Sequence, residues 1–237
     1  HPVERIATVS RHSRYSRTYF NQADVRLRSS AQHEALAEVT AEMDNFRAAW
    51  DWAVIQGEFA LIERAARIIA YFYDIRGWLH EGYDTLGLAI AALETAHAQV
   101  PPARTNQVAL GHLLSARSVL VSRLGQYTQA QAMLERSLDI LRPLNEPRVL
   151  VESITLLGTV MELTGNYARA SELYSEGQEL ATAIGDRWFA ALCLICLIGL
   201  DGITQTTIKP EITYERLQSA VVDWRAIGDP RFTAIAL

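Results

Sequence analysis

Lysine, cysteine and long apolar runs are all scarce in this sequence, and each scarcity narrows what the chain can be. Lys209 is the only lysine among 237 residues, so arginine carries almost all the positive charge, and the formal net charge is -5. A net negative charge gives no global indication of a nucleic-acid-binding protein. The longest apolar run covers residues 188–200, which is shorter than the roughly 20 residues that cross a bilayer. We therefore expect no membrane partner.

The two cysteines have the spacing of a redox or metal-binding pair, Cys193-x-x-Cys196. Their flanking residues are apolar and helical in pattern, and no second Cys or His pair lies nearby. Buried thiols of this kind behave as small hydrophobic side chains. We interpret both as core residues. Free thiols are typical of a reducing compartment, so we expect a cytoplasmic protein.

Motifs for catalysis and nucleotide binding are also missing. The sequence has no Gly-x-x-x-x-Gly-Lys-Ser/Thr loop, no Gly-x-Ser-x-Gly and no Ser-x-x-Lys. His80 and Asp84 have a spacing that shares one helix face, but two ligands do not make a zinc site. We expect a chain that is not an enzyme and that uses no metal or cofactor.

Helical periodicity runs through almost the whole chain, and no stretch shows the alternation and turns of a β-hairpin. Residues 124–134 and 164–174 share Gly-x-Tyr followed by an alanine and a large side chain, at an offset of 40 residues. A copy without tyrosine begins at Arg76. A further, degenerate copy lies after residue 174, toward the C-terminus, and its second helix begins at Pro210. The sequence therefore contains an internal repeat of helical units.

Each shared position has a physical role in a pair of antiparallel helices. Gly77, Gly125 and Gly165 predict left-handed helix caps, where a β-carbon costs energy. The small residues Ala130 and Ala170 are expected to let two helices approach closely. Such a pair cannot bury its apolar face alone and must stack on its neighbour. The sequence therefore predicts an all-α fold, a right-handed superhelix of antiparallel helix pairs.

This pattern resembles the tetratricopeptide repeat, which has Gly, Tyr, Ala and Phe or Tyr at the same relative positions. The repeat here is longer than is usual in that family, so its helices should be longer by about one to two turns. We divide the chain into a helical arm at residues 1–40, the first helix pairs at residues 41–100 and tetratricopeptide-like repeats at residues 101–237. The last of these repeats is degenerate and truncated.

A second resemblance lies in residues 43–53, Met-Asp-Asn-Phe-Arg-Ala-Ala-Trp-Asp-Trp-Ala. They are similar to the Glu-x-Asp-Asn-Leu-Arg-Ala-Ala-Leu-x-Trp-Ala block that follows the nucleotide-binding core of bacterial signal-transduction ATPases with numerous domains. Transcriptional regulators are among these proteins. The resemblance implies that the chain is a sensor arm, with an ATPase domain as its intramolecular partner. The sequence starts without Met, so we expect a longer protein, and a stand-alone tetratricopeptide scaffold is the alternative.

Stacked helix pairs curve, and the first helix of each pair lines the concave side. When the repeat positions are applied to this sequence, the concave side carries side chains of both charges and many hydroxyl groups. Such a surface suits a protein segment or a small polar ligand. These candidate groove residues are Arg64, Arg67, Tyr71, Asp74, His112, Ser115, Val119, Ser122, Arg123, Glu152, Thr155, Thr159 and Glu162. A solvated polar face without a ligand is the other interpretation. The family's clamp for C-terminal carboxylates needs Lys and Asn where Arg67 and Tyr71 stand, so we do not expect chaperone tails to bind.

The N-terminal segment is basic and includes Arg5, Arg11, Arg14 and Arg17. Three interpretations stay open for it. It is a solvated face, a docking surface for the ATPase domain, or a nucleic-acid contact, because its arginines alternate with aromatic residues. The solvated face is favoured, and nucleic acid is the least favoured of the three.

Overall fold

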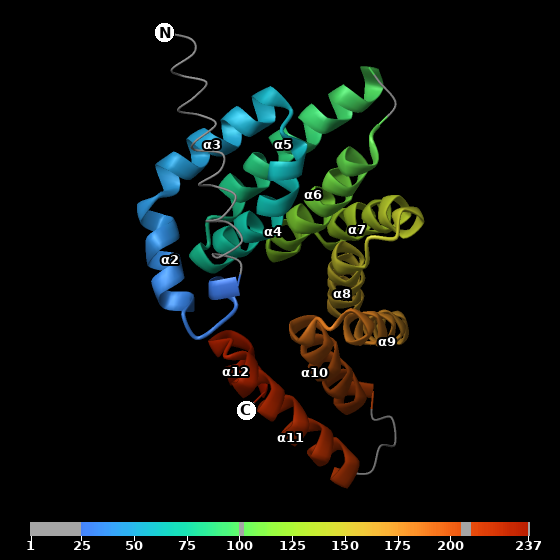
Figure 1. Ribbon diagram of the computed structural model, residues 1–237. Coiled ribbons are helices and arrows are strands. Elements are labelled where there is room, and N and C mark those ends of the chain that lie inside the picture. The colour runs from blue at the N-terminus through green and yellow to red at the C-terminus, as the bar shows by residue number, and fades with distance from the viewer. Residues whose placement is uncertain (1–24, 100–101, 205–209, 237) are drawn as a thin grey trace.

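The computed structural model describes residues 25–99, 102–204 and 210–236. These residues form helices and turns without any β-strand, which confirms the predicted all-α fold. The helices are α2 (Gln32–Ala41), α3 (Met43–Gln56), α4 (Phe59–Arg76), α5 (Leu79–Gln99), α6 (Arg104–Arg123), α7 (Tyr127–Leu141), the 3-10 helix η1 (Arg142–Leu144), α8 (Pro147–Leu163), α9 (Tyr167–Ile184), α10 (Arg187–Thr204), α11 (Pro210–Ile227) and α12 (Pro230–Ala236). Figure 1 shows successive helix pairs stacked into a curved solenoid. The basic segment with Arg5, Arg11, Arg14 and Arg17 lies outside the described residues.

Left-handed glycines end the first helices of the repeats at the predicted places. The φ angles are 72° at Gly77, 76° at Gly125 and 80° at Gly165. At the end of α4, the N–H of Gly77 donates to the carbonyl of Asp74 at 3.2 Å. A β-carbon at any of these three glycines would meet nothing within 4 Å. The backbone conformation, rather than a lack of space, therefore accounts for glycine at these turns.

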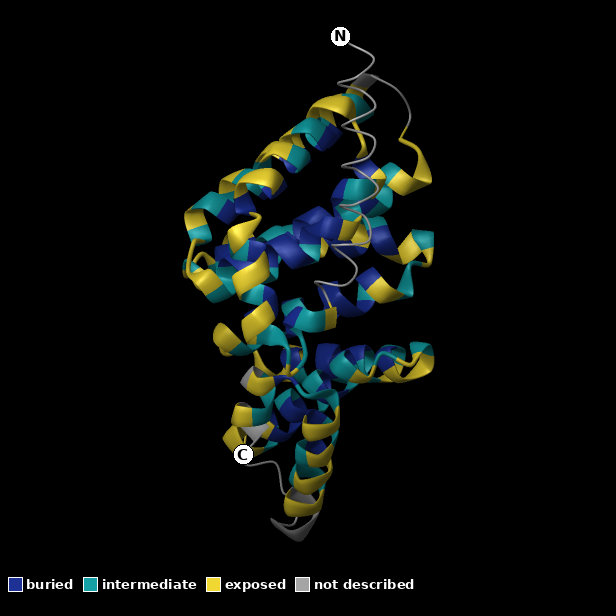
Figure 2. Cartoon of the chain, turned by 60° about the vertical axis from the view of Figure 1, so that its left-hand side comes forward, coloured by how far each residue is buried: buried dark blue, intermediate teal, exposed yellow. Residues whose placement is uncertain are grey.

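Small residues allow the helices of each pair to approach closely. Ala130 of α7 and Ala170 of α9 both have 0% of their surface exposed. Gly82 of α5 holds the equivalent position, and a β-carbon there would lie 2.7 Å from Leu120 of α6. The first helices α4, α6, α8 and α10 also contact one another in succession. Figure 2 shows the buried core that runs through the stacked helices.

The block at residues 43–53 belongs to α3 and anchors this helix to the first repeat. Phe46 and Trp50 are buried, and the indole N–H of Trp50 donates to a backbone carbonyl of α5 at 3.3 Å. The guanidinium of Arg47 donates two hydrogen bonds, of 2.6 and 2.8 Å, to the carboxylate of Glu81 in α5. The residues that carry the second resemblance therefore have a structural role where the solenoid begins.

The last helix pair departs from the repeat pattern. Its second helix, α11, begins at Pro210, where the sequence predicted it. Three aromatic residues, Trp188, Trp224 and Phe232, join α10, α11 and α12, with ring centroids 4.9, 5.1 and 5.8 Å apart. By length and composition alone α10 could cross a membrane, with a mean hydropathy of 1.6. In this fold it packs between α9 and α11.

The two ends of the described chain meet beside α10. The guanidinium carbon of Arg28 lies 5.2 Å from the ring centroid of Trp188. Gly228, just before α12, lies against Ser30, because a β-carbon at Gly228 would be 3.3 Å from the Ser30 backbone nitrogen. Figure 1 shows α12 returning toward the start of α2. Residues far apart in sequence thus close the solenoid on one side.

Candidate functional site

A cavity of about 350 Å³ lies between the first helices of the repeats and the two chain ends. Its walls come from α4, α6, α8, α9, α10 and α12, together with one arginine that precedes α2. The lining residues are Arg28, Arg67, Ala70, Tyr71, Asp74, Val119, Arg123, Glu152, Leu156, Thr159, Glu162, Tyr174, Trp188, Phe189, Leu192, Cys196 and Phe232. Every repeat from α4 onward therefore contributes residues to the cavity.

Eight of the thirteen predicted groove residues line this cavity: Arg67, Tyr71, Asp74, Val119, Arg123, Glu152, Thr159 and Glu162. Of the other five, Arg64 is exposed and Ser122 is half-buried. His112, Ser115 and Thr155 are buried between helices, at 5%, 0% and 1% exposure. They share the first helices with the cavity residues but face a neighbouring helix. Helical periodicity identifies a helix face about 100° wide. Such a face includes both residues that point into the cavity and residues that point toward a neighbouring helix.

The charged residues of the cavity wall are paired across repeats. Arg123 of α6 donates from Nε and Nη2 to the two carboxylate oxygens of Asp74 in α4, at 2.7 and 3.2 Å. Arg67 of α4 has its Nη1 3.4 Å from Oε2 of Glu152 in α8. A bidentate guanidinium–carboxylate pair is both stronger and more directional than a single ionic contact. These pairs therefore hold the first helices of different repeats at defined positions.

Tyr174 of α9 reaches past α8 to the cavity wall. Its hydroxyl donates to Oε2 of Glu162 at 2.7 Å and lies 3.2 Å from the hydroxyl of Thr159. Its ring packs on Gly158, where a β-carbon would lie 2.7 Å from Cε1 of the tyrosine. Burial raises the pKa of the Tyr174 hydroxyl far above its usual range, so the group remains a hydrogen-bond donor. Tyr174 thereby fixes the position of the Glu162 carboxylate.

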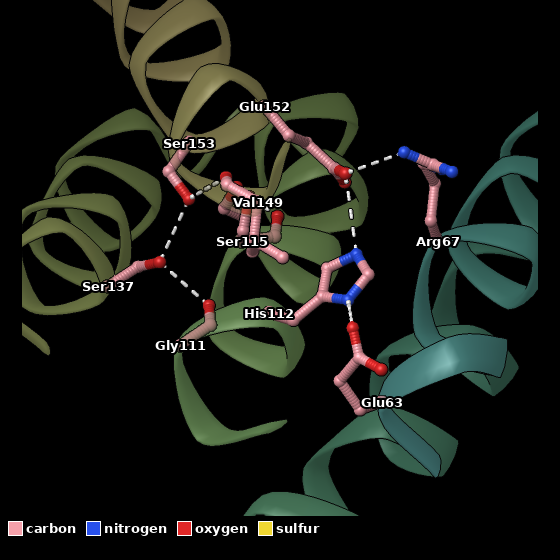
Figure 3. A network of polar contacts seen from close by, with 10 residues as sticks. Glu63, Arg67, Gly111, His112, Ser115, Ser137, Val149, Glu152 and Ser153 are labelled. Carbon is pink, nitrogen blue, oxygen red and sulfur yellow. Dashed lines mark hydrogen bonds and ion pairs between the residues drawn. The ribbon is translucent and has the colours of Figure 1, made fainter. Parts of the chain in front are cut away.

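Behind the wall, His112 of α6 lies between two carboxylates (Figure 3). Its Nδ1 is 3.0 Å from Oε1 of Glu63, and its Nε2 is 3.3 Å from Oε2 of Glu152. Burial by itself would lower the pKa of His112, but the charges of Glu152 and Glu63 and the hydrogen bond to Glu63 outweigh it and raise the pKa to about 9. For Glu63, burial works to raise the pKa, but the hydrogen bond and charge of His112 outweigh it and lower the pKa. The imidazole is therefore cationic at neutral pH and links α4, α6 and α8.

A hydroxyl cluster lies next to this network and contacts three helices (Figure 3). Ser137 of α7 donates to the backbone carbonyl of Gly111 in α6 at 2.7 Å, and its oxygen lies 3.0 Å from that of Ser153 in α8. Both serines have 0% exposure. The hydrogen bonds satisfy buried polar groups within the core, so the cluster has a structural role.

The aromatic end of the cavity was not predicted from the sequence. The ring of Trp188 makes edge-to-face contacts with Phe189 and Phe232, at centroid distances of 4.9 and 5.1 Å. Its indole N–H donates to Oδ2 of Asp229 at 3.1 Å, which holds the ring in place. The apolar run at residues 188–200 was the available signal. The direction in which this run faces depends on how the last helix pair packs. Because that pair is degenerate, the repeat pattern does not predict which of its residues face the cavity.

Both cysteines are free thiols on α10. Cys193 is fully buried, as predicted, whereas Cys196 is half-buried and lines the cavity. Burial raises the pKa of Cys193 to about 11 and that of Cys196 to about 12. In the part of the chain that the structure describes, no three His, Cys, Asp or Glu side chains are grouped as a metal site would require. The thiols are therefore weakly reactive side chains near neutral pH.

Comparison with known proteins agrees with this architecture. The sequence profile of the tetratricopeptide repeat matches residues 109–183, which cover most of α6 and continue almost to the end of α9. No curated protein matches the sequence.

Two solved structures share the fold at low sequence identity. BtubC (BKLC) from P. vanneervenii is 14% identical, with a TM-score of 0.57, over 96% of this chain and 91% of that protein. A signal-transduction ATPase with numerous domains from Pyrococcus horikoshii, which has a tetratricopeptide repeat sensor, is 16% identical with a TM-score of 0.54. That match covers 93% of this chain but only 37% of the ATPase. The chain is therefore an all-α helical solenoid, in which residues 109–183 match the tetratricopeptide repeat.

Proposed function

We propose that this chain is a non-catalytic recognition module and that its cavity is where a protein segment or a small ligand binds. The observation that carries the proposal is the composition of the cavity wall. It takes side chains from four first helices and from both ends of the described chain. An occupant would therefore contact all the repeats from α4 onward at once. Binding there would favour one curvature of the solenoid over others.

The state of the titratable groups supports a role without chemistry. His112 is held as a cation between Glu63 and Glu152, so it is not poised to exchange a proton near neutral pH. The thiol of Cys196 is kept protonated by burial, which raises its pKa to about 12. Carboxylates in the cavity wall accept hydrogen bonds or ion pairs from neighbouring residues. These groups are arranged to stabilise the wall rather than to act as acid, base or nucleophile.

We propose further that the module is the sensor arm of a multidomain signalling ATPase of the transcription-regulator kind, in the cytoplasm. Two observations support this. The block at residues 43–53 resembles the segment after the ATPase core of such proteins, and the P. horikoshii ATPase, which has a tetratricopeptide repeat sensor, shares the fold over 37% of its length. In such an arrangement a change of curvature would be transmitted through α3 to the preceding domain. Arg47 and Glu81 would carry this coupling, because they join α3 to α5.

A stand-alone scaffold for protein interactions is the second candidate. The P. vanneervenii protein supports it, since 91% of that chain aligns with this one and the fold therefore occurs in a protein of similar length. The coding sequence on either side of residues 1–237 discriminates between the two. A sensor arm requires a Gly-x-x-x-x-Gly-Lys-Ser/Thr loop in the flanking sequence. If the flanking sequence encodes only further helical repeats, the sensor-arm proposal is wrong and the stand-alone scaffold is supported.

A matched pair of arginine variants tests coupling in the complete protein. Arg123→Glu reverses the charge facing Asp74 in the cavity, whereas Arg136→Glu reverses the charge facing Glu94 outside it. The two arginines are 48% and 50% exposed, and both pair with an earlier repeat. If the module is a sensor, Arg123→Glu changes the rate of ATP hydrolysis by about fivefold or more and Arg136→Glu does not. Equal rates for the two variants, at equal melting temperatures, would contradict the proposal.

A further inference from the structure

The cavity is small and partly open to solvent. Its volume of about 350 Å³ is within the range of pockets that hold small molecules. Of the seventeen described residues that line it, only Arg123 is exposed, and the others are buried or half-buried. An extended peptide needs a groove in which its main chain can enter and leave. A cavity of this size, with a lining that is mostly buried or half-buried, therefore fits a free small molecule better than a peptide.

The charges in the cavity wall balance one another. Three arginines and three carboxylates line it: Arg28, Arg67, Arg123, Asp74, Glu152 and Glu162. Arg123 pairs with Asp74 and Arg67 with Glu152, Arg28 lies over the ring of Trp188, and Glu162 accepts a hydrogen bond from Tyr174. An ionic ligand would have to break one of these contacts and leave a charge uncompensated in a half-buried place, which is costly. The wall therefore selects an uncharged occupant.

The rest of the lining is apolar or aromatic. Ala70, Val119, Leu156 and Leu192 supply aliphatic surface between the charged pairs and the aromatic end. Phe189 and Phe232 stand at 79° and 87° to the ring of Trp188, so the three rings form a corner. Aromatic rings prefer edge-to-face or offset contacts with a further ring. Because the hydrogen bond to Asp229 holds Trp188 in place, a planar ligand would meet a preformed surface.

We infer that the cavity binds an uncharged, planar aromatic small molecule, with its ring at the aromatic end that Trp188, Phe189 and Phe232 form. This inference rests on the proposed function, because it takes the cavity as the recognition site. It also changes the ligand class. The sequence indicated a polar ligand from the many charged residues on the first helices. In the structure these residues satisfy one another, and the surface left for a ligand is mainly hydrophobic.

Two related dyes test the charge and shape of the site. N-phenylnaphthylamine is uncharged and fluoresces in apolar surroundings, and anilinonaphthalenesulfonate has a similar ring system with a negative charge. With the chain of residues 1–237, we expect the fluorescence of the uncharged dye to saturate at one site per chain. The sulfonate should bind at least about tenfold more weakly, because its charge would have to displace the existing contacts of the charged residues in the wall. Equal affinity for both dyes, or no saturable binding of the uncharged dye, overturns the inference.

Matched variants locate the bound dye. Val119→Phe fills the cavity from α6, and Leu192→Phe fills it from α10. Val222→Phe makes the same change as the first variant at a site on α11 that is 64% exposed. We expect about tenfold weaker dye binding in both cavity variants and wild-type binding in the control. Undiminished binding in a cavity variant that still melts cooperatively overturns the inference, and if one variant fails to fold, the other decides.

The two thiols give a second measurement on the unaltered chain. Cys196 lines the cavity, whereas Cys193 on the same helix is buried in the core and does not line it. Bound N-phenylnaphthylamine should slow alkylation of Cys196 at alkaline pH, measured by mass spectrometry, and leave Cys193 unchanged. An unchanged rate at Cys196 overturns the inference. These outcomes are independent of the ATPase experiment, so a failed dye test leaves the recognition module as a protein-binding surface.

Discussion

Gly158 of α8 faces the ring of Tyr174 of α9 so closely that a β-carbon on the glycine would lie 2.7 Å from the ring carbon Cε1. The tyrosine needs this position because its hydroxyl donates to Glu162 at 2.7 Å. Packing between the two helices and the placement of a carboxylate in the cavity wall thus depend on the same glycine. This coupling gives a direct test of the core.

Gly158→Ala should destabilise the protein. The added methyl group must push the ring of Tyr174 away, and overpacking of a core typically costs about 1–3 kcal/mol. Gly199→Ala is the control, because a β-carbon at Gly199 meets nothing within 4 Å on an exposed part of α10. The control should gain about 0.5–1 kcal/mol from helix propensity. Chemical denaturation measures both free energies of unfolding, and equal effects of the two changes would contradict the packing.

Ala130→Leu and Ala170→Leu should each cost about 1–3 kcal/mol, because both alanines are fully buried where two helices approach. Ala132→Leu on the exposed face of α7 is the matched control and should be within about 0.5 kcal/mol of the wild type. Thermal melts provide the comparison. If the two buried changes are as mild as the control, these alanines do not set the distance between helices.

Stability should fall as the pH rises, because of His112. The pKa of this imidazole is raised to about 9 in the folded state from 6.5. A raised pKa stabilises the fold fully below about pH 6.5, and the contribution is lost as the pH rises through about 9. The loss is at most about 3–4 kcal/mol, since one pKa unit corresponds to about 1.4 kcal/mol. We expect unfolding free energies of the wild type to decline over this range.

His112→Gln is the variant that assigns this pH dependence. It should be less stable than the wild type below about pH 9, because Glu63 and Glu152 lose their cationic partner. Between about pH 6.5 and 9 its stability should be nearly constant. A decline as steep as that of the wild type would show that other groups cause the effect.

Both thiols should resist alkylation in the folded protein. Burial raises their pKa values to about 11 and 12, so at about pH 8 iodoacetamide should react roughly a hundredfold more slowly than with an ordinary free thiol. The same protein in denaturant serves as the control and should label at Cys193 and Cys196 at the ordinary rate. Rapid labelling of Cys193 in the folded state would mean that α10 opens locally.

The repeats and their turns could be predicted because their causes are local. Gly125 and Gly165 each indicate a positive φ at a single residue. The spacing from these glycines to Ala130 and Ala170 indicates where the two helices of one pair approach. The groove was predicted in part for the same reason. A helical period identifies the first helices and one broad face, but it does not tell a residue such as Thr159 in the cavity wall from Thr155 behind it.

By itself, then, the sequence determined the helix pairs and their left-handed turns. Only the tertiary structure decided how the cavity is bounded and what its surface is like. Arg28 reaches Trp188, and Gly228 lies against Ser30, across nearly the whole length of the chain. Such contacts depend on the curvature summed over all the repeats and on an irregular last pair. The charged residues of the cavity wall also pair between different repeats, and this pairing leaves a mainly hydrophobic surface. A local sequence pattern does not show how far apart such residues lie.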